Sequence, residues 1–596
     1  MYIRILIVFI TAFTCASYPD TSGTFPHFIT RSNDTLFDGN RVFRFISFNV
    51  PNLHLLEDDF SFTATNNWSL TTTFEINDAL QSVAQAGGMV VRIYCLRIRR
   101  QGEPDFLPMH ITDWRTYYEP SFRTLDTVLA LAARHRIRLI IPILEGPPWW
   151  GPKREFARLH GGLHGFESRK VRDDYKHLVG YLLNRRNGIT GTLYKDDKTV
   201  LCWETGNEMR TSGSWLAEMA AYIKSIDGTH LVMDGNYGVR RAALDDPNVD
   251  IVSNHFYKKD AAGITRDLRK IAGKKVYIIG EWGWSLSKAH EVINQTVHSS
   301  VAGALIWSVR PRYRTGGFTW HKSEGLHWPG GFNREELPDE QAILTAVRNG
   351  ACSINGTTPP PFPPPAPPVL LPVNHPSAIS WQGSAGATRY TVERAPSADG
   401  PWITVGDSID ETVVAYRPLF SDTVAALGDT GYYRVIASGP GGTSAPSIPY
   451  GPLAVNHSTL VDELLPDREK FSANKGTRFT DNRPWRYKYD FHRRKGKKHD
   501  YFEYTVNGNI SIVRLYAFFP KKRSDFILRF STDGNTWSSA VSEVTEYPYC
   551  CANPKDRLRL PVLFEAKAPS GVHNRVRVFF PGGGGEAGRV EIDYRE

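Results

Sequence analysis

The most constraining feature of this sequence is a regular alternation of short β-rich runs and amphipathic helical stretches before residue 359. Eight runs rich in Val, Ile, Leu, Phe and Tyr are typical of parallel strands that are buried on both faces. They are RVFRFISFNV near residue 41, MVVRIYCL near 89, RLIIPIL near 138, TVLCWET near 199, HLVMDG near 230, DIVSNHFY near 250, VYIIGEW near 276 and GALIWSV near 303. The alternation predicts a parallel sheet covered by helices.

The stretches between the runs carry apolar residues three and four positions apart, the spacing of one helix face. They include EINDALQSVAQAG, SFRTLDTVLALAARH, RKVRDDYKHLVGYLLNRR and KAHEVINQTVHSSVAG. Eight strand–helix units within about 330 residues match a (β/α)8 TIM barrel with an N-terminal hairpin and long loops. A doubly wound sheet is the alternative, but no Gly-rich phosphate loop follows the first strand. We therefore predict the barrel over residues 18–350.

At 596 residues the chain exceeds what one core supports, and a proline-rich segment marks the end of the barrel. Residues 351–368 contain PPPFPPPAPP, which favours extended polyproline II and predicts a linker. Short alternating strands then fill residues 369–455 and 456–596, which predicts two β-sandwich domains after the TIM barrel. The first resembles a fibronectin type III module with Trp381 and Tyr433 in its core. The second resembles a jelly-roll or galactose-binding-like sandwich, for which we also consider glycan binding.

The chain begins with MYIRILIVFITAFTCAS, which has the pattern of a signal peptide over residues 1–17. Its apolar run of about ten residues is shorter than the roughly 20 that a membrane span needs. We therefore expect a secreted, extracellular protein without membrane insertion. Six N-x-Ser/Thr sequons fit a glycoprotein. They begin at Asn33, Asn67, Asn294, Asn355, Asn456 and Asn509.

Cysteine and charge exclude several classes of protein. Beyond the leader stand Cys95, Cys202, Cys352, Cys550 and Cys551, an odd and sparse set whose pairing stays open. The net charge is +9, with its densest cluster at Arg493, Arg494, Lys495, Lys497 and Lys498. We expect that cluster to be a solvated loop. A secreted chain without a recognition motif predicts no nucleic-acid partner, whereas an acidic glycan stays open.

Polar residues stand where the predicted strands end, and TIM-barrel sites are built at the carboxyl ends of strands. They are Asn49, Arg92, Glu145, Asn207, Glu208, His255, Tyr257, Glu281 and Trp307. Glu208 in WETGNE and Glu281 in GEWGW should converge across the rim. Two carboxyls about 5 Å apart can hydrolyse a glycosidic bond with retention of configuration. Salt-bridge partners at a barrel mouth are the alternative.

These motifs resemble glycoside hydrolase clan A, and family 5 in particular. The resemblance implies that Glu208 is the acid/base, Glu281 the nucleophile and Asn207 a ligand of the sugar 2-hydroxyl. The other matched positions are Arg92 as a strand-two arginine, His255-Phe256-Tyr257 as a strand-six His-x-Tyr motif, and Trp307 as a platform under the cleaved sugar. We expect no cofactor. The scattered histidines also lack the paired spacing of a zinc site.

Physical chemistry favours the same roles. Arg92 and Tyr257 beside Glu281 should stabilise its ionised form. Glu208, partly desolvated and facing a second carboxylate, should keep its proton near neutral pH. Trp307, and with less support Trp282 and Trp284, offers an apolar face to a pyranose, although we expect core packing for one of the latter two.

The best sequence indication of the substrate is Arg185–Glu208, RRNGITGTLYKDDKTVLCWETGNE, which resembles the approach to strand four in family 5 endo-β-mannanases. It implies β-1,4-mannan as substrate, unless the stretch only fixes barrel geometry. Two features depart from those mannanases. Glu145 adds a third carboxylate, and the long loop RPRYRTGGFTWHKSEGLHWPGGF after Trp307 could block one end of the cleft.

Three alternatives therefore stay open. Within the enzyme class they are an exo-β-mannosidase and a β-1,4-glucanase. An inactive, glycan-binding barrel is the alternative of another class. Because the linker separates the barrel from the sandwiches, we also expect the barrel to act on soluble substrate without them.

Overall fold

The structure is a computed structural model. It describes residues 25–57, 68–161, 164–257, 262–319, 325–332, 337–412, 417–488, 490–520, 522–547, 558–582 and 584–596. The predicted signal peptide, Asn67, Cys550 and Cys551 lie outside these ranges. Cys95, Cys202 and Cys352 are buried free thiols.

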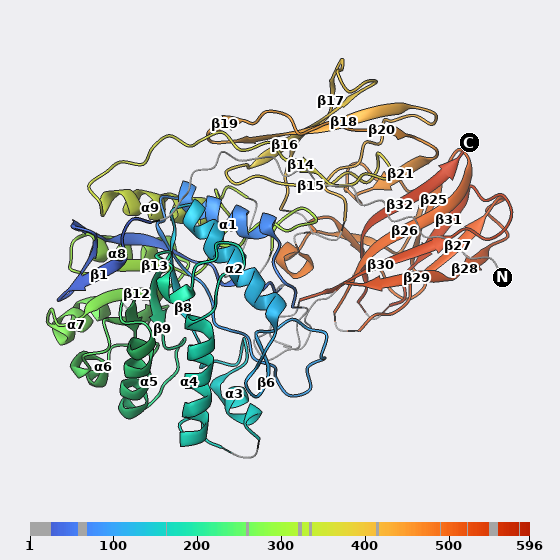
Figure 1. Cartoon of the computed structure of the whole chain (residues 1–596). Coiled ribbons are helices and arrows are strands. Elements are labelled where there is room, and N and C mark those ends of the chain that lie inside the picture. Colours follow the sequence, from blue (N-terminus) through green and yellow to red (C-terminus); the bar gives the residue numbers. More distant parts are fainter. Residues whose placement is uncertain are drawn as a thin grey trace, which may run out of the picture.

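Eight parallel strands close into a barrel, so the prediction of a TIM-like barrel is confirmed (Figure 1). The strands, in chain order, are β4 (Phe45–Asn49), β5 (Val90–Arg92), β8 (Arg138–Pro142), β9 (Val200–Glu204), β10 (Leu231–Met233), β11 (Ile251–Phe256), β12 (Val276–Trp282) and β13 (Gly303–Ile306). Each lies within one of the eight apolar runs. Their residues are buried throughout, because the interior of the barrel and the surrounding helices cover both faces.

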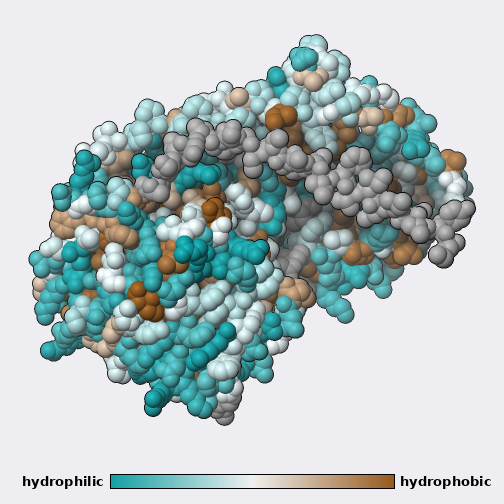
Figure 2. Space-filling model, viewed as in Figure 1, coloured by the Kyte–Doolittle hydropathy of each residue, from teal (hydrophilic) through white to brown (hydrophobic). Residues whose placement is uncertain are grey.

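Helices surround the barrel and bury one apolar face each. They are α1 (Thr73–Gln85), α2 (Glu119–Arg134), α3 (Lys153–Leu159), α4 (Arg169–Leu183), α5 (Gly213–Ile226), α6 (Arg241–Asp245), α7 (Ala262–Ile271), α8 (Leu286–Val297) and α9 (Glu340–Ser353). Thr72 and Glu75 form a capping box at the start of α1. Over these helices the surface is mainly hydrophilic, with only small apolar patches (Figure 2). No described helix is long and apolar enough to cross a membrane.

The predicted N-terminal hairpin is part of a three-stranded sheet, β1 (Ile29–Ser32), β2 (Thr35–Asp38) and β3 (Arg41–Val42). Ile29 and Leu36 pack with Val90, Ile140 and Leu201 at the amino ends of the barrel strands. This apolar layer closes one end of the barrel. The opposite end, where the strands finish, is left for the polar side chains.

After the linker, a small β-rich unit contains the sheet β17 (Ile403–Ile409), β16 (Arg389–Ala395), β18 (Thr430–Gly439) and β19 (Gly442–Thr443). β20 (Tyr450–Ala454) also pairs with β18, and β14 (Val369–Leu370) pairs with β15 (Trp381–Gln382). Trp381 and Tyr433 are buried in its core, as expected. The sheets fit a β-sandwich, whereas the fibronectin type III assignment stays a prediction.

The last unit packs two antiparallel sheets around one apolar core. The larger contains β21 (Ser458–Asp462), β23 (Arg478–Thr480), β24 (Arg493–Lys495), β26 (Asn509–Phe519), β29 (Ser542–Glu546), β30 (Leu560–Lys567) and β32 (Glu586–Arg595). The smaller has the order β22 (Ala473–Lys475), β25 (Tyr501–Thr505), β31 (Arg575–Phe579), β27 (Ile527–Ser531) and β28 (Ser538–Ala540). This arrangement agrees with a β-sandwich.

The expected solvated basic loop is only partly correct. Arg493 and Arg494 lie in β24, are buried, and pair with Glu586 and Glu469. A buried guanidinium needs a carboxylate partner to offset its lost hydration. Lys495, Lys497 and Lys498 are exposed, as expected.

The loop after β13 joins the barrel to both β-rich units. Arg312 donates to Glu411 Oε1 at 2.8 Å and to the carbonyl oxygen of Ala387 at 2.9 Å, and both partners belong to the first β unit. Phe318 and Phe332 pack against Trp485 and Phe491 of the second unit. The loop is therefore a structural junction.

Candidate active site

The polar strand ends meet at the open end of the barrel around a pocket of about 420 Å³. This volume lies within the range of small-molecule sites, about 300–1,000 Å³. The pocket is lined by Tyr94, Glu145, Pro147, Trp149, Asn207, Glu208, Tyr257, Glu281, Trp284 and Trp307. Six of the predicted site residues therefore share one pocket: Glu145, Asn207, Glu208, Tyr257, Glu281 and Trp307.

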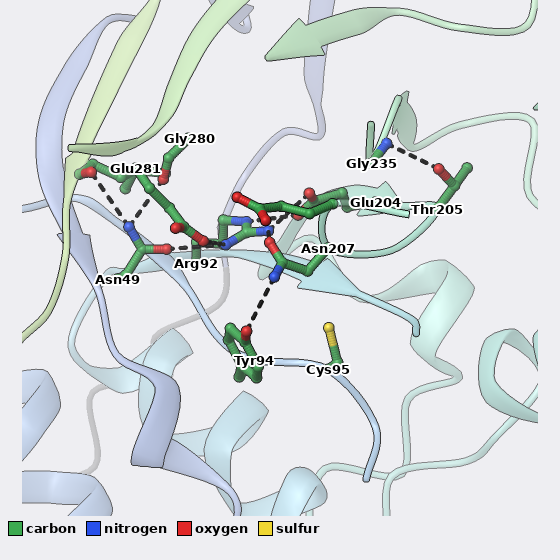
Figure 3. A network of polar contacts seen from close by, with 12 residues as sticks. Asn49, Arg92, Tyr94, Cys95, Glu204, Thr205, Asn207, Gly235, Gly280 and Glu281 are labelled. Carbon is green, nitrogen blue, oxygen red and sulfur yellow. Dashed lines mark hydrogen bonds and ion pairs between the residues drawn. The ribbon is translucent and has the colours of Figure 1, made fainter. Parts of the chain in front are cut away.

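Arg92 organises the base of the pocket from the end of β5 (Figure 3). Its Nε and one terminal nitrogen bind both oxygens of Glu204 at 2.7 and 2.9 Å. The same guanidinium donates to Glu281 Oε1 at 2.8 Å and to Asn207 Oδ1 at 2.8 Å. Burial acts against the charge, but Glu204 and Glu281 hold the pKa of Arg92 well above its usual range. The guanidinium therefore orients several side chains as a permanent cation.

Glu281, at the end of β12, receives donors from two directions. Arg92 contacts Oε1, and the Tyr257 hydroxyl donates to Oε2 at 2.5 Å. Asn49 lies behind this carboxylate, where its amide donates to the carbonyl oxygen of Gly280 at 2.9 Å. A buried carboxylate with two such donors is held in one orientation, as a nucleophile requires.

Glu208 follows β9 in a left-handed backbone conformation, with φ of 50°. That conformation is uncommon for a residue other than glycine and fixes the direction of the side chain. Gly146 packs against this backbone so closely that an added Cβ would lie 2.2 Å from the Glu208 carbonyl oxygen. The site therefore depends on a glycine in the neighbouring loop.

The contacts of Glu208 do not favour the high proton affinity that we expected. Burial raises the pKa of Glu208, but the hydrogen bond and the charge of His255 lower it by more. The net effect is a pKa below its ordinary range. His255 Nδ1 lies 2.8 Å from Glu208 Oε1. We had expected the facing carboxylate to keep Glu208 protonated. The imidazole of His255, which binds Glu208 directly, instead favours the ionised form.

The two carboxyls lie at a distance suited to chemistry between them. One oxygen of Glu208, one oxygen of Glu281 and a ring nitrogen of His255 all lie within 4.8 Å of one another. The same three atoms could in principle hold a metal ion. The hydrogen bond between His255 and Glu208 accounts for their approach without one.

Glu145 is the third carboxylate of the pocket and is fully buried. It accepts from the Tyr94 hydroxyl at 2.5 Å, from the backbone nitrogen of Trp150 at 3.1 Å and from the Asn207 amide at 3.3 Å. Burial raises the pKa of Glu145 to about 8 despite these donors. At neutral pH this carboxyl is therefore mostly protonated, and it helps to orient the Asn207 amide.

Three tryptophans form the apolar walls: Trp149, Trp284 and Trp307. Trp307 packs edge-on against Tyr94 and Trp149, with ring centroids 5.5 and 5.8 Å away. Trp282 is instead fully buried in the core between the barrel and its helices. Side chains alternate along a strand, so Trp282 points away from the pocket that its neighbour Glu281 faces, whereas Trp284 lies beyond the end of β12 and lines the pocket. This corrects the expectation that Trp282 binds substrate.

Two stretches singled out in the sequence lie outside the pocket lining. Arg185, Asn187 and Tyr194 all bind Asp126 of α2, so the segment before β9 serves barrel geometry. No described residue of the loop after Trp307 lines the pocket. Its role as a block across the cleft is therefore not seen in the described part of that loop.

Sequence reasoning missed Glu204, Tyr94 and Trp149. Glu204 stands within WETGNE, and a carboxylate inside an apolar strand indicates a buried cation nearby. Tyr94 and Trp149 gave no such signal, because aromatic residues in apolar runs are usually core. The predicted site residues Arg92 and His255 do not line the pocket. Arg92 contacts Glu281 and His255 contacts Glu208, so each positions a carboxylate.

The comparisons point to the same class of proteins. A model of the family described as GH family 5 beta-mannosidase-like matches residues 155–268, a range that includes Glu208 and His255. Mannan endo-1,4-beta-mannosidase 1 of Arabidopsis thaliana is 33% identical over 193 residues, which are 29% of this chain and 46% of that protein. Mannan endo-1,4-beta-mannosidase 8 of Oryza sativa subsp. japonica is 32% identical over 199 residues, 30% and 52% of the two chains. The chain thus spans about half the length of these relatives.

Among solved structures, a glycoside hydrolase family 5 mannosidase of Rhizomucor miehei aligns with a TM-score of 0.45 and 15% identity. It covers 55% of this chain and 98% of its own. The endo-1,4-beta-mannanase of the same organism aligns with a TM-score of 0.43 and 20% identity, over 55% and 99% of the two chains.

Proposed function

We propose that this chain is a retaining β-glycosidase that hydrolyses β-1,4-linked mannan, with Glu208 as acid/base and Glu281 as nucleophile. The observation that carries the proposal is the approach of their carboxylate oxygens and His255 within 4.8 Å, on the rim of a tryptophan-lined pocket. Retaining enzymes place their two carboxyls about 5 Å apart, whereas inverting enzymes need room for a water.

In the first step, Glu281 attacks the anomeric carbon while Glu208 protonates the glycosidic oxygen, so the leaving sugar departs as an alcohol. In the second, Glu208 takes a proton from water, which attacks the anomeric carbon and frees Glu281. Substrate binding excludes water from the pocket, and this desolvation raises the pKa of Glu208 from its value in the empty pocket. His255 then keeps the carboxyl aimed at the bond.

Mannan as the substrate is supported by the relatives named mannan endo-1,4-beta-mannosidase. Asn207 is the proposed ligand of the 2-hydroxyl, because Arg92 fixes its oxygen and leaves its amide near Tyr94 and Glu145. Trp307 is the proposed platform under the sugar, whose C–H face suits an indole. We also propose secretion, on the leader pattern of residues 1–17.

An exo-β-mannosidase is the second candidate, favoured by the description of the matched family as beta-mannosidase-like. The two differ in their products. An exo-acting enzyme releases mannose alone from mannohexaose, whereas an endo-acting enzyme releases shorter oligosaccharides from the first minutes of reaction.

The proposal is tested by incubating the protein with β-mannan, cellulose and xylan while NMR follows the anomeric proton. We expect turnover of mannan with an initial β product. An initial α product would overturn the retaining mechanism, and turnover of cellulose alone would indicate a glucanase. Binding of mannan by a folded protein without turnover of any polymer would indicate the inactive barrel.

A further inference from the structure

The outer face of the five-stranded sheet in the last unit carries an unusual set of side chains. Residues alternate across this sheet, so Phe502, Tyr504, Val576, Val578, Leu528 and Phe530 point into the core. The outward positions of β25, β31 and β27 include Tyr501, Glu503, Arg575, Arg577, Phe579, Ile527 and Arg529, and Lys475 of β22 lies beside Tyr501 on the same face. We call this set the outer face. It lies at the end of the molecule away from the barrel (Figure 1).

Aromatic rings and guanidinium groups alternate along the outer face. Arg577 lies 4.0 Å from the ring centroid of Trp537 and 4.7 Å from that of Tyr501. The Tyr501 and Phe579 rings are 5.1 Å apart, and Arg529 lies 5.1 Å from Phe579. These rings are half-buried and Arg529 is exposed, so the face combines apolar surface with accessible cations.

The outer face is also electropositive. Its carboxylate, Glu503, is only 4% exposed, because Arg577 and Arg575 cover it at 2.7 and 3.3 Å. Two guanidinium groups against one carboxylate leave a positive charge. Arg529 and Lys475, which pairs in register with Tyr501, add two exposed cations.

The basic cluster of the sequence lies next to this face. Lys497 and Lys498 stand in the turn that leads into β25, and both are exposed. Asp500 is the acid of that turn, and its carboxylate accepts from the backbone nitrogen of Lys497 at 2.6 Å. The local excess of positive charge therefore extends beyond the sheet.

We propose that the outer face binds an anionic polysaccharide, with Tyr501 and Phe579 against the sugar rings and Arg529 and Lys475 on the acidic groups. Aromatic faces match the C–H faces of pyranoses, and guanidinium groups bind carboxylates and sulfates through charge-assisted hydrogen bonds. The complementarity of charge selects an acidic polymer over a neutral one. This site is separate from the hydrolytic pocket and goes beyond the proposed reaction.

The test measures binding, so it does not depend on hydrolysis. The full chain carrying Glu281→Gln, which should not hydrolyse mannan, is titrated by calorimetry with polygalacturonate, heparin and neutral galactomannan at low ionic strength. We expect the two acidic polymers to bind in a salt-sensitive manner, because screening weakens exposed charges. Arg529→Ala with Lys475→Ala should weaken that binding about tenfold or more, since each charge-assisted contact contributes a factor of this order.

A matched control is Arg478→Ala with Lys567→Ala, which removes the same charge from exposed positions on β23 and β30 of the other sheet. It should leave the affinity within about twofold of that of the unchanged protein. Tyr501→Ala should weaken binding and Tyr501→Phe should not, because stacking needs the ring alone. Unchanged thermal melting shows that each variant is folded.

Three outcomes would overturn the proposal. One is an equal loss in the outer-face and control variants, which would indicate a net-charge effect. Another is an affinity for neutral galactomannan that the outer-face variant loses as well. The third is equal binding of single-stranded DNA by the same face, which would indicate a general polyanion surface.

Discussion

At the scale of single residues, replacing the proposed nucleophile and replacing the proposed acid/base should have different effects. Glu281→Gln removes the nucleophile and should abolish turnover of both mannan and a nitrophenyl β-mannoside. Glu208→Gln removes the acid, which a nitrophenolate leaving group does not need. Because Glu208 also activates water in the second step, the quantity to compare is kcat/KM, which reports the first step. It should fall by about 10²–10⁴ on mannan but far less on the nitrophenyl substrate. Initial rates on both substrates test this.

Glu218→Gln serves as a control, because that carboxylate lies on the outer surface of α5, paired with Arg172 and Lys176. It should keep both activities. Full activity of Glu281→Gln, or an equal loss on both substrates for Glu208→Gln, would mean that the roles are misassigned.

The buried Glu145 should make stability depend on pH. Its pKa is raised by burial to about 8, above the ordinary value that it regains on unfolding. The folded state thus binds the proton of Glu145 more tightly than the unfolded chain does. Protonated Glu145 therefore adds to the free energy of unfolding below the ordinary carboxyl pKa, and this contribution is lost as pH rises through about 8. Urea unfolding from pH 5 to 9 should show a shallower decline for Glu145→Gln than for the unchanged protein.

Glu411 and Asp490, with pKa values raised by burial to about 7 and about 6, also contribute to that decline. They are present in both proteins, so the difference between the two curves isolates Glu145. Parallel curves would contradict a raised pKa at this position.

At the scale of elements, the loop after β13 depends on a buried cation. Arg312 is fully buried between Asp78 of α1, at 3.2 Å, and Glu411 of the first β unit, at 2.8 Å. Glu411→Ala should lower the free energy of unfolding by about 3 kcal/mol, because it removes one of the two carboxylates that offset the buried charge of Arg312. Chemical denaturation measures the change.

Glu393→Ala is the matched control in the same β unit. Glu393 pairs with Arg434 at a half-exposed position, where an ion pair contributes about 1 kcal/mol or less. A cost for Glu411→Ala no larger than that of Glu393→Ala would show that Arg312 finds another partner.

At the scale of the whole molecule, the barrel and the two β units hold one another. Besides Arg312 and the Phe318 contacts, Arg417 of the first β unit binds Glu463 at 3.0 Å and Asp490 at 3.4 Å in the second. The expectation that the barrel acts without the sandwiches stays untested, but these contacts lead us to a different prediction. Each unit contacts both others, so the three units are held together by more than the linker.

Truncation after residue 358 should therefore lower the melting temperature of the barrel and its activity on soluble mannan. The cause would be exposure of Arg312 and loss of support for the loop that follows Trp307. Calorimetry and initial rates test this prediction. Unchanged melting after truncation would mean that the contacts contribute little.

The barrel and its pair of glutamates could be predicted from the sequence because both depend on local patterns. Apolar runs identify strands, and the carboxyl ends of parallel strands share one rim, which places Glu208 and Glu281 together. Side-chain partners could not be predicted in this way. Arg92 and Glu204 are 112 residues apart, and only folding brings them to 2.7 Å. The same holds for the orientation of Trp282 and Trp284 and for the effect of His255 on Glu208.

The sequence by itself therefore determined the architecture of the barrel, the β-rich character of the remaining chain and the candidate catalytic pair. Tertiary structure alone decided that the pKa of Glu145 is raised and that of Glu208 lowered, and how the loop after β13 joins the three units. The physical reason is range. Hydrophobic periodicity acts over a few residues, whereas burial and charge pairing depend on neighbours that lie far apart in the chain.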